Sequence, residues 1–144
     1  MKTNRGTLIC LLFAFAFAKS FSQKINLQDI NLNSPTENIS VQTLFTDSSI
    51  VSSFIIQIKK NVKTHKHEKH AEHVFVIEGQ GTMELGDEQF SIKQGDLIFI
   101  PANTFHSVET KSKIPLKVIS IQAPFFDGKD RIFKTSVSDS LKQN

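Results

Sequence analysis

The sequence has 144 residues, of which 39% are hydrophobic and 22% are charged, and these values are typical of one globular domain. With six Gly and four Pro, its composition excludes the collagen-like, low-complexity and intrinsically disordered classes. The formal net charge of +3 supports a nucleic-acid partner only if the basic residues belong to the folded domain.

The first 22 residues have the organisation of an export signal. Two basic residues precede an unbroken run of apolar and small residues at 7–18. As a helix, this run would rise about 18 Å, which is too short to cross about 30 Å of hydrocarbon. It matches the apolar region of a secretory signal peptide. We therefore predict a signal peptide over residues 1–22, cleaved after Ala18 or Ser22, and a protein that is exported to the periplasm or secreted; an uncleaved anchor is the alternative.

Removing this segment changes the chemistry of the chain. Lys2, Arg5 and Lys19 are three of the 17 basic residues, so the remaining 14 balance the 14 acidic residues. This balance argues against a nucleic-acid partner, and no membrane anchor remains after cleavage. Cys10, the single cysteine, also leaves, and lipid attachment there is disfavoured because the bulky Ile9 precedes it. The mature chain therefore has no disulfide, no thiolate nucleophile and no cysteine-based zinc site.

Beyond an N-terminal segment at 23–38, short strand-like runs alternate with turn residues. In these runs apolar and polar residues alternate or β-branched and aromatic residues are frequent. The runs lie at 39–45, 50–58, 74–77, 82–85, 88–92, 97–100, 105–108 and 116–121. Gly86-Asp87 signals a turn between two of them, and Pro101 suits a strand end. No run has convincing helical periodicity. The pattern predicts an all-β antiparallel sandwich or barrel over 39–126, followed by a C-terminal extension at 127–144 with a polar tail.

All five histidines lie between His65 and His106. In a strand, residues two apart point to the same face, so His65 and His67 can present their imidazoles to one ion. Glu72 begins the next strand in phase with Val74, and it can bring a carboxylate to the same interior. His106 returns from a distant strand as a fourth candidate ligand. Three neutral imidazoles and one carboxylate suit a divalent transition metal, namely Fe, Mn, Ni, Cu or Zn.

Two short motifs carry a resemblance to a known family. His65, His67, Glu72 and Gly79 are spaced like the first motif of the cupin superfamily, and Gly95, Pro101, Asn103 and His106 are spaced like the second. The resemblance covers about residues 40–125 and is to small single-domain bacterial cupins. It implies a double-stranded β-helix of jelly-roll type in which His65, His67, Glu72 and His106 hold a metal.

The chain departs from the cupin pattern at three positions. Lys59 stands where the first motif begins with Gly, and Thr110 stands where the second motif ends with Asn. Asn103 replaces the central Gly of the second motif, which is a mild change because Asn tolerates left-handed turns. All four expected ligand positions match the family pattern.

Other charged and imidazole groups have simpler interpretations. We favour a solvated surface for His70 and His73, the latter because it is out of phase with Glu72. A series of lysines could form a basic rim for an anionic ligand but more often marks a solvated loop, and its members are Lys59, Lys60, Lys63, Lys66 and Lys69. The charged stretch at 127–131 indicates a capped turn or an edge with ion pairs.

Three functions are compatible with these features. The first is a metal-dependent enzyme acting on a small organic molecule, and the resemblance implies dioxygenase or isomerase chemistry. The second is a non-catalytic module that binds a metal or a small ligand, and the third is a structural barrel with a vestigial site. No catalytic residue and no organic cofactor are assigned, since Glu78 or Glu84 could act as a base only if it faces the cavity. Exposed sheet edges, with 23–46 as the candidate segment, predict a homodimer.

Overall fold

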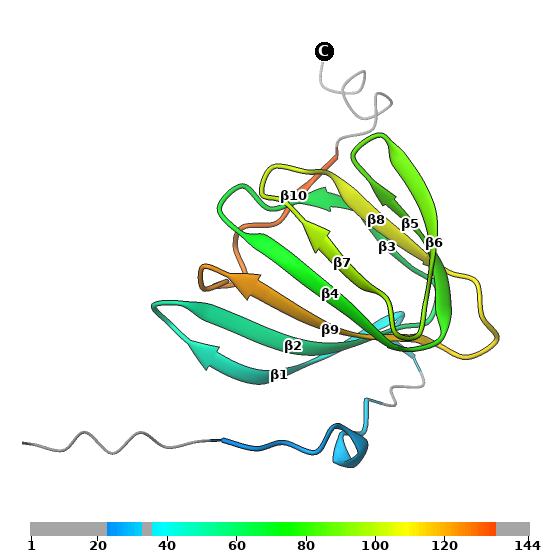
Figure 1. Cartoon of the computed structure of the whole chain (residues 1–144), viewed down its shortest axis with the longest axis horizontal. Coiled ribbons are helices and arrows are strands. Elements are labelled where there is room, and N and C mark those ends of the chain that lie inside the picture. Colours follow the sequence, from blue (N-terminus) through cyan, green and yellow to red (C-terminus); the bar gives the residue numbers. More distant parts are fainter. Residues whose placement is uncertain (1–22, 33–35, 135–144) are drawn as a thin grey trace, which may run out of the picture.

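A computed structural model describes residues 23–32 and 36–134 of the chain (Figure 1). The predicted signal peptide at 1–22 lies outside the described residues, as do residues 135–144 of the extension. The described part is almost entirely β-structure, with one 3-10 helix, η1 (Leu27–Asp29). None of its helices is long and apolar enough to cross a membrane.

The strands form two five-stranded antiparallel sheets that face each other (Figure 1). The first sheet has the order β1-β2-β9-β4-β7, and the second has the order β10-β3-β8-β5-β6. The strands are β1 (Ile39–Asp47), β2 (Val51–Ile58), β3 (Asn61–Lys66), β4 (Ala71–Glu78), β5 (Gln80–Leu85), β6 (Glu88–Lys93), β7 (Leu97–Ile100), β8 (His106–Thr110), β9 (Leu116–Ala123) and β10 (Ile132–Phe133). The predicted all-β double-stranded β-helix is confirmed.

Two of these strands, β3 and β10, were not among the predicted runs. The β3 sequence contains one aliphatic residue, Val62, so it lacks the alternation by which the other strands are recognised. β10 is two residues long and forms only by pairing with β3. Both are therefore strands because of their neighbours rather than because of their own composition.

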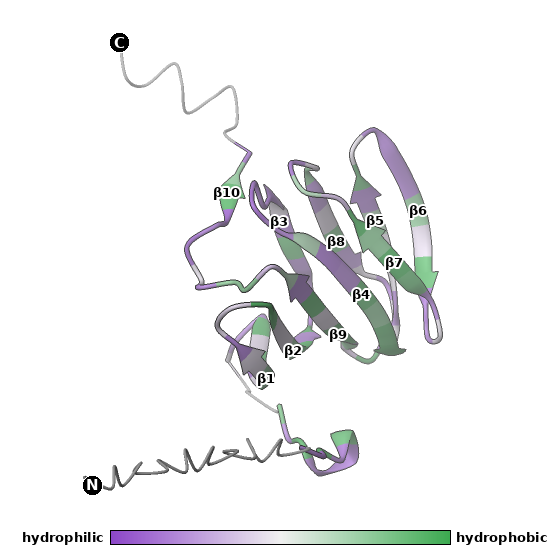
Figure 2. Ribbon diagram, turned by 60° about the vertical axis from the view of Figure 1, so that its left-hand side comes forward, coloured by the Kyte–Doolittle hydropathy of each residue, from purple (hydrophilic) through white to green (hydrophobic). Residues whose placement is uncertain are grey.

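The apolar core lies between the sheets. It is a cluster of buried aliphatic side chains, namely Ile58, Val76, Met83, Ile92, Ile98, Ile100, Leu116 and Val118. Figure 2 shows apolar and polar segments alternating along the strands of both sheets, as expected when one face of each strand is buried. Burial of this face supplies the main driving force for closing the two sheets on each other.

The first strand is an edge strand held to its own chain. β1 pairs with β2 over its whole length, with a bulge between Thr43 and Phe45. The Asn38 side chain fastens its start, since the amide oxygen accepts from the Lys60 N–H at 2.8 Å and the amide nitrogen donates to the Asn61 carbonyl at 2.7 Å. The other edge of β1 is not paired with another described strand.

Candidate metal centre

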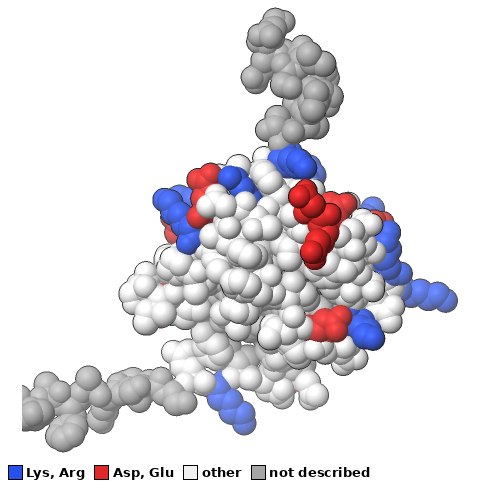
Figure 3. Space-filling view, turned by 45° about the horizontal axis from the view of Figure 1, so that its top comes forward, with Lys and Arg blue, Asp and Glu red and all other residues white. Residues whose placement is uncertain are grey.

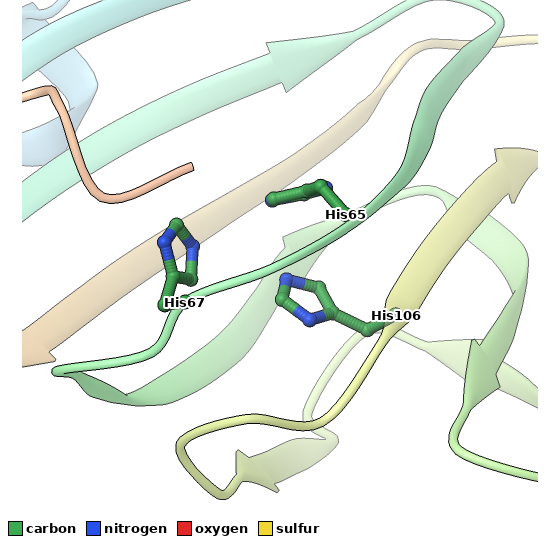
Figure 4. Close-up of side chains that lie close together, drawn as sticks. All are labelled: His65, His67 and His106. Atoms are coloured by element: carbon green, nitrogen blue, oxygen red, sulfur yellow. The ribbon is translucent and has the colours of Figure 1, made fainter. Parts of the chain in front are cut away.

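Four buried side chains meet at one end of the barrel interior. His65 lies in β3, His67 follows this strand, Glu72 lies near the start of β4 and His106 opens β8. Their exposed fractions are between 3% and 6%. Figure 4 shows the three imidazoles grouped together, although they come from two segments about 40 residues apart in the sequence. The structure therefore brings together all four residues that the sequence analysis selected.

A β-bulge aims His65 at this group. The register of β3 against β8 pairs Val62 with Val108 and His65 with His106, so β3 has one more residue than β8 between these pairs. Such an extra residue reverses the alternation of the bulged strand. Without it, Val62 and His65 would point to opposite faces; with it, both line the interior cavity.

The distances within the group fit a single ion. One ring nitrogen from each histidine lies within 4.8 Å of the others. The ring centroids of His65 and His106 are 4.3 Å apart, and those of His67 and His106 are 5.5 Å apart. The Glu72 carboxylate oxygen Oε2 lies 3.7 Å from the His67 Nε2 and 3.6 Å from the His106 Nε2. That these four bind a metal remains a prediction.

Backbone carbonyls orient all three rings in the same way. The Nδ1 atom of each histidine faces a carbonyl oxygen, and these partners are Lys63 for His65 at 2.8 Å, Thr104 for His106 at 3.0 Å, and Asp130 for His67. Because a carbonyl only accepts, each Nδ1 carries the proton and each Nε2 of a neutral ring has a free lone pair. The His67 Nε2 is buried and has no hydrogen-bond partner.

The carboxylate of Glu72 is also held in place. The Ser120 hydroxyl donates to its Oε1 atom, and the Gln122 side-chain amide donates to the Ser120 Oγ at 3.3 Å. Both partners come from β9, the strand that pairs with β4. One carboxylate oxygen is therefore engaged, and the other faces His67 and His106.

The environment keeps the imidazoles of His65 and His106 neutral. Burial, with a contribution from the neighbouring His106, lowers the pKa of His65 to about 3. Burial also lowers the pKa of His106. Neutral imidazole is the form that binds metals. Neutral nitrogen donors, an unpartnered buried Nε2 and one carboxylate together fit a divalent transition metal.

Asn103 supports the loop that carries His67. Its φ of +64° is left-handed, as expected for Asn at the position where the cupin motif has Gly. In this conformation its N–H donates to the His67 carbonyl at 2.6 Å. The departure from the family pattern at Asn103 therefore preserves the turn.

The prediction that His70 is solvated is wrong. Its side chain is buried between two acceptors, with Nδ1 at 2.6 Å from the Asp130 carboxylate and Nε2 at 2.8 Å from the Phe125 carbonyl. A doubly protonated ring satisfies both. These partners lie 60 and 55 residues along the chain, so no local pattern could reveal them. His73 is exposed beside the Phe99 ring, as expected from its phase.

A C-terminal strap, residues 124–131, crosses this end of the barrel. The Phe126 N–H donates to the Ser52 Oγ at 3.1 Å, and the Phe126 ring packs edge-on against His67 and His70. The Asp130 carboxylate accepts the backbone N–H groups of Glu68 and Lys69 at 3.0 and 2.7 Å. For this stretch a capped turn or an edge with ion pairs was predicted; a capped turn is present at Asp127, whose carboxylate accepts the Lys129 N–H at 2.9 Å, whereas the contribution of Asp130 to the site was missed.

The acidic charge of Asp130 is stabilised by these contacts. Partial burial raises its pKa, but the hydrogen bonds from Lys69, Glu68 and His70 outweigh burial and lower the pKa below its ordinary value. The strap is therefore fixed by a charged anchor beside the loop of His67.

A cavity of about 90 Å³ adjoins the four candidate ligands. Its wall is mostly aliphatic, and its polar lining comes from the ligands together with Ser107, Gln122 and Arg131. The two carboxylates considered as bases do not line it: Glu78 pairs with Lys117 at 3.3 Å, and Glu84 accepts from the Ser107 hydroxyl at 2.9 Å.

Comparison with known proteins relates this fold and site to one family. The family model described as "Cupin domain" matches residues 53–122. An uncharacterized protein of Methanocaldococcus jannaschii is 34% identical over 76 residues, which are 53% of this chain and 61% of that protein. A mannose-1-phosphate guanylyltransferase of Salmonella muenchen is 31% identical over 88 residues, 61% of this chain and 19% of the enzyme. The quercetin 2,3-dioxygenase of Bacillus subtilis is 35% identical over 60 residues, 42% of this chain and 18% of the enzyme.

The chain thus spans less than two thirds of the length of each of these relatives. Among solved structures, a double-stranded β-helix protein of Klebsiella pneumoniae aligns with a TM-score of 0.68 at 15% identity, covering 81% of this chain and all of that one. That likeness supports the fold. The matched domain, the two facing sheets and the histidine motifs agree, and the chain contains a small cupin domain.

Proposed function

We propose that this cupin domain binds one divalent transition metal through His65, His67, Glu72 and His106 and acts on a small organic molecule. The observation that carries the proposal is the common orientation of the three rings, which turns each Nε2 lone pair away from the backbone. A five- or six-coordinate metal held by four protein ligands would leave a position for substrate and would supply Lewis-acid or redox chemistry. Iron would favour a dioxygenase, and manganese or zinc would favour an isomerase.

A second candidate is a non-catalytic module that binds a metal or a small ligand. It is favoured by the cavity lining, because the described residues that line it include no titratable acid or base other than the four ligands and Arg131. The two candidates share the metal site and differ in turnover. Oxygen uptake by the Fe²⁺-loaded protein with small phenols and hydroxy acids would support the enzyme, whereas binding without turnover would support the module.

Metal analysis tests the shared site. The purified protein is offered Fe²⁺, Mn²⁺, Ni²⁺, Cu²⁺ and Zn²⁺ separately, beside the double variant His67→Ala/His106→Ala and the control His73→Ala. Concentrations come from amino-acid analysis, because the chain has neither Trp nor Tyr. We expect about one metal per chain in the parent and the control and almost none in the double variant. A folded parent that takes up none of these metals would overturn the assignment.

We further propose that the protein is exported and works as a homodimer. Residues 1–22 support export, and recovery of a chain that begins after Ala18 or Ser22 from the periplasm or medium would test it.

The unpaired edge of β1 supports the dimer, and so does an exposed apolar surface on β4, β7 and β9 formed by Phe75, Leu97, Phe99 and Ile121. In Figure 3 the charged side chains gather toward the margins of the view and leave its middle largely uncharged. Light scattering that gives a monomer at high concentration would contradict the dimer.

A further inference from the structure

Arg131 is a cation at the cavity without an acidic partner in the described structure. Its side chain lines the cavity together with His65 and His106. No carboxylate of residues 23–32 and 36–134 forms an ion pair with it, and its guanidinium carbon lies 6.0 Å from the centroid of the Phe126 ring. The adjacent Asp130 is engaged by His70 and two backbone N–H groups. The guanidinium is therefore available to a ligand.

Gln122 offers an unused acceptor in the same cavity. Its side chain is 3% exposed, and its Oε1 has no hydrogen-bond partner. The Ser120 hydroxyl gives its single proton to Glu72, so its oxygen can only accept from the amide nitrogen of Gln122. This network leaves the Gln122 carbonyl oxygen without a donor. A buried acceptor of this kind is costly unless a ligand or water supplies an O–H or N–H group.

The charges around the cavity do not cancel once a metal is bound. A divalent ion and the Glu72 carboxylate leave one positive charge, and Arg131 adds a second. Most of the remaining wall is aliphatic, with Val74, Met83 and Leu116 among its members, whereas Arg131 is itself exposed to solvent.

We propose that the cavity takes a small organic carboxylate that also bears a hydroxyl group, with Arg131 pairing with the carboxylate and the Gln122 Oε1 accepting from the hydroxyl. This inference rests on the proposed metal site, since the metal supplies part of the positive charge. Arg131 would then determine specificity rather than take part in the chemistry. A guanidinium matches a carboxylate with two parallel hydrogen bonds, which a neutral amide cannot reproduce.

Matched probes test the proposal by calorimetric titration of the protein loaded with Mn²⁺, the metal content of every sample being measured. Lactate has both groups, lactamide has the hydroxyl but no charge, and propionate has the charge but no hydroxyl. We expect lactate to bind at least about ten-fold tighter than lactamide, as a charged hydrogen bond implies. Arg131→Gln should reduce this ratio to about three-fold or less with unchanged metal content. Gln122→Leu should remove the preference for lactate over propionate.

The control is Lys129→Gln, which removes an exposed cation two residues from Arg131 whose nearest acid is Asp127 at 3.9 Å. It should leave all three affinities unchanged. Equal binding of lactate and lactamide by the fully loaded parent, or a preference that survives Arg131→Gln, would overturn the proposal. If the parent does not load Mn²⁺ or any other metal, the proposed metal site is overturned instead. The same titrations on the metal-free protein then test, independently of the metal, whether Arg131 binds the carboxylate.

Discussion

The two ends of the barrel interior are built from the same strands and differ in what those strands direct inward. Along β9, the inward positions are Leu116 and Val118 at one end and Ser120 and Gln122 at the other. Along β4, the corresponding change is from Val76 to Glu72. From Glu72 to Val76 the alternation of β4 is continuous, and this stretch pairs with Gln122 to Val118 of β9 in one register. The aliphatic end supplies apolar burial, and the polar end presents ligands on a rigid support.

The largest effect on stability is expected at the aliphatic end. Leu116 is fully buried, and Leu116→Ala should lower the free energy of unfolding by about 2–5 kcal/mol through lost burial and a residual cavity. Ile114→Ala, at a side chain 49% exposed, should change it by less than about 0.5 kcal/mol. Urea unfolding measures both. Equal losses would show that the aliphatic end is not the main source of stability.

Removing the metal with a chelator should reveal how much the polar end of the barrel contributes to stability. If the protein binds its metal as proposed, a free metal concentration one hundred times Kd stabilises it by about 2.7 kcal/mol. Adding a chelator should therefore lower the melting temperature of the parent and leave that of His67→Ala/His106→Ala unchanged. A chelator effect that persists in the double variant would place the bound metal elsewhere.

The charged anchor of the strap should link stability to metal affinity. Asp130→Asn removes the charge that faces His70, and we expect a loss of about 1.5–3 kcal/mol in unfolding free energy. Because the Asp130 carbonyl orients His67, a displaced strap should also weaken metal binding about ten-fold. Asp127→Asn is the matched control, since its carboxylate is half exposed. Unchanged metal affinity in Asp130→Asn would limit the anchor to a structural role.

The metal-free protein should lose stability gradually as the pH falls below 6.5. His65 has a pKa of about 3 when folded and an ordinary value of 6.5 when unfolded, so the unfolded chain binds more protons in this window. Stability from this group is complete above pH 6.5 and falls by about 1.4 kcal/mol per pH unit per proton. His106 acts in the same direction. Urea unfolding between pH 6.5 and 5 measures the slope, which should be shallower in His65→Gln.

The sequence alone determined the β-class and the four candidate ligands. Period-two alternation and turn residues are local properties, and the spacing of His65 and His67 is short enough for local geometry to direct both imidazoles to one side, with Glu72 following in the next strand. The position of His106 followed from its resemblance to the second cupin motif. These features depend on near neighbours in the chain, and the structure brings the four side chains together as expected.

Tertiary structure decided the rest, because the contacts that matter join distant residues. The bulge of β3 depends on its register with β8, and no feature of the sequence Asn61–Lys66 predicts it. The burial of His70 depends on partners in the strap, 55 and 60 residues away. From the sequence alone, Arg131 is indistinguishable from other surface charges. It lines the cavity because the strap crosses this end of the barrel. A local pattern predicts which way a side chain alternates, whereas its electrostatic partners are set by packing.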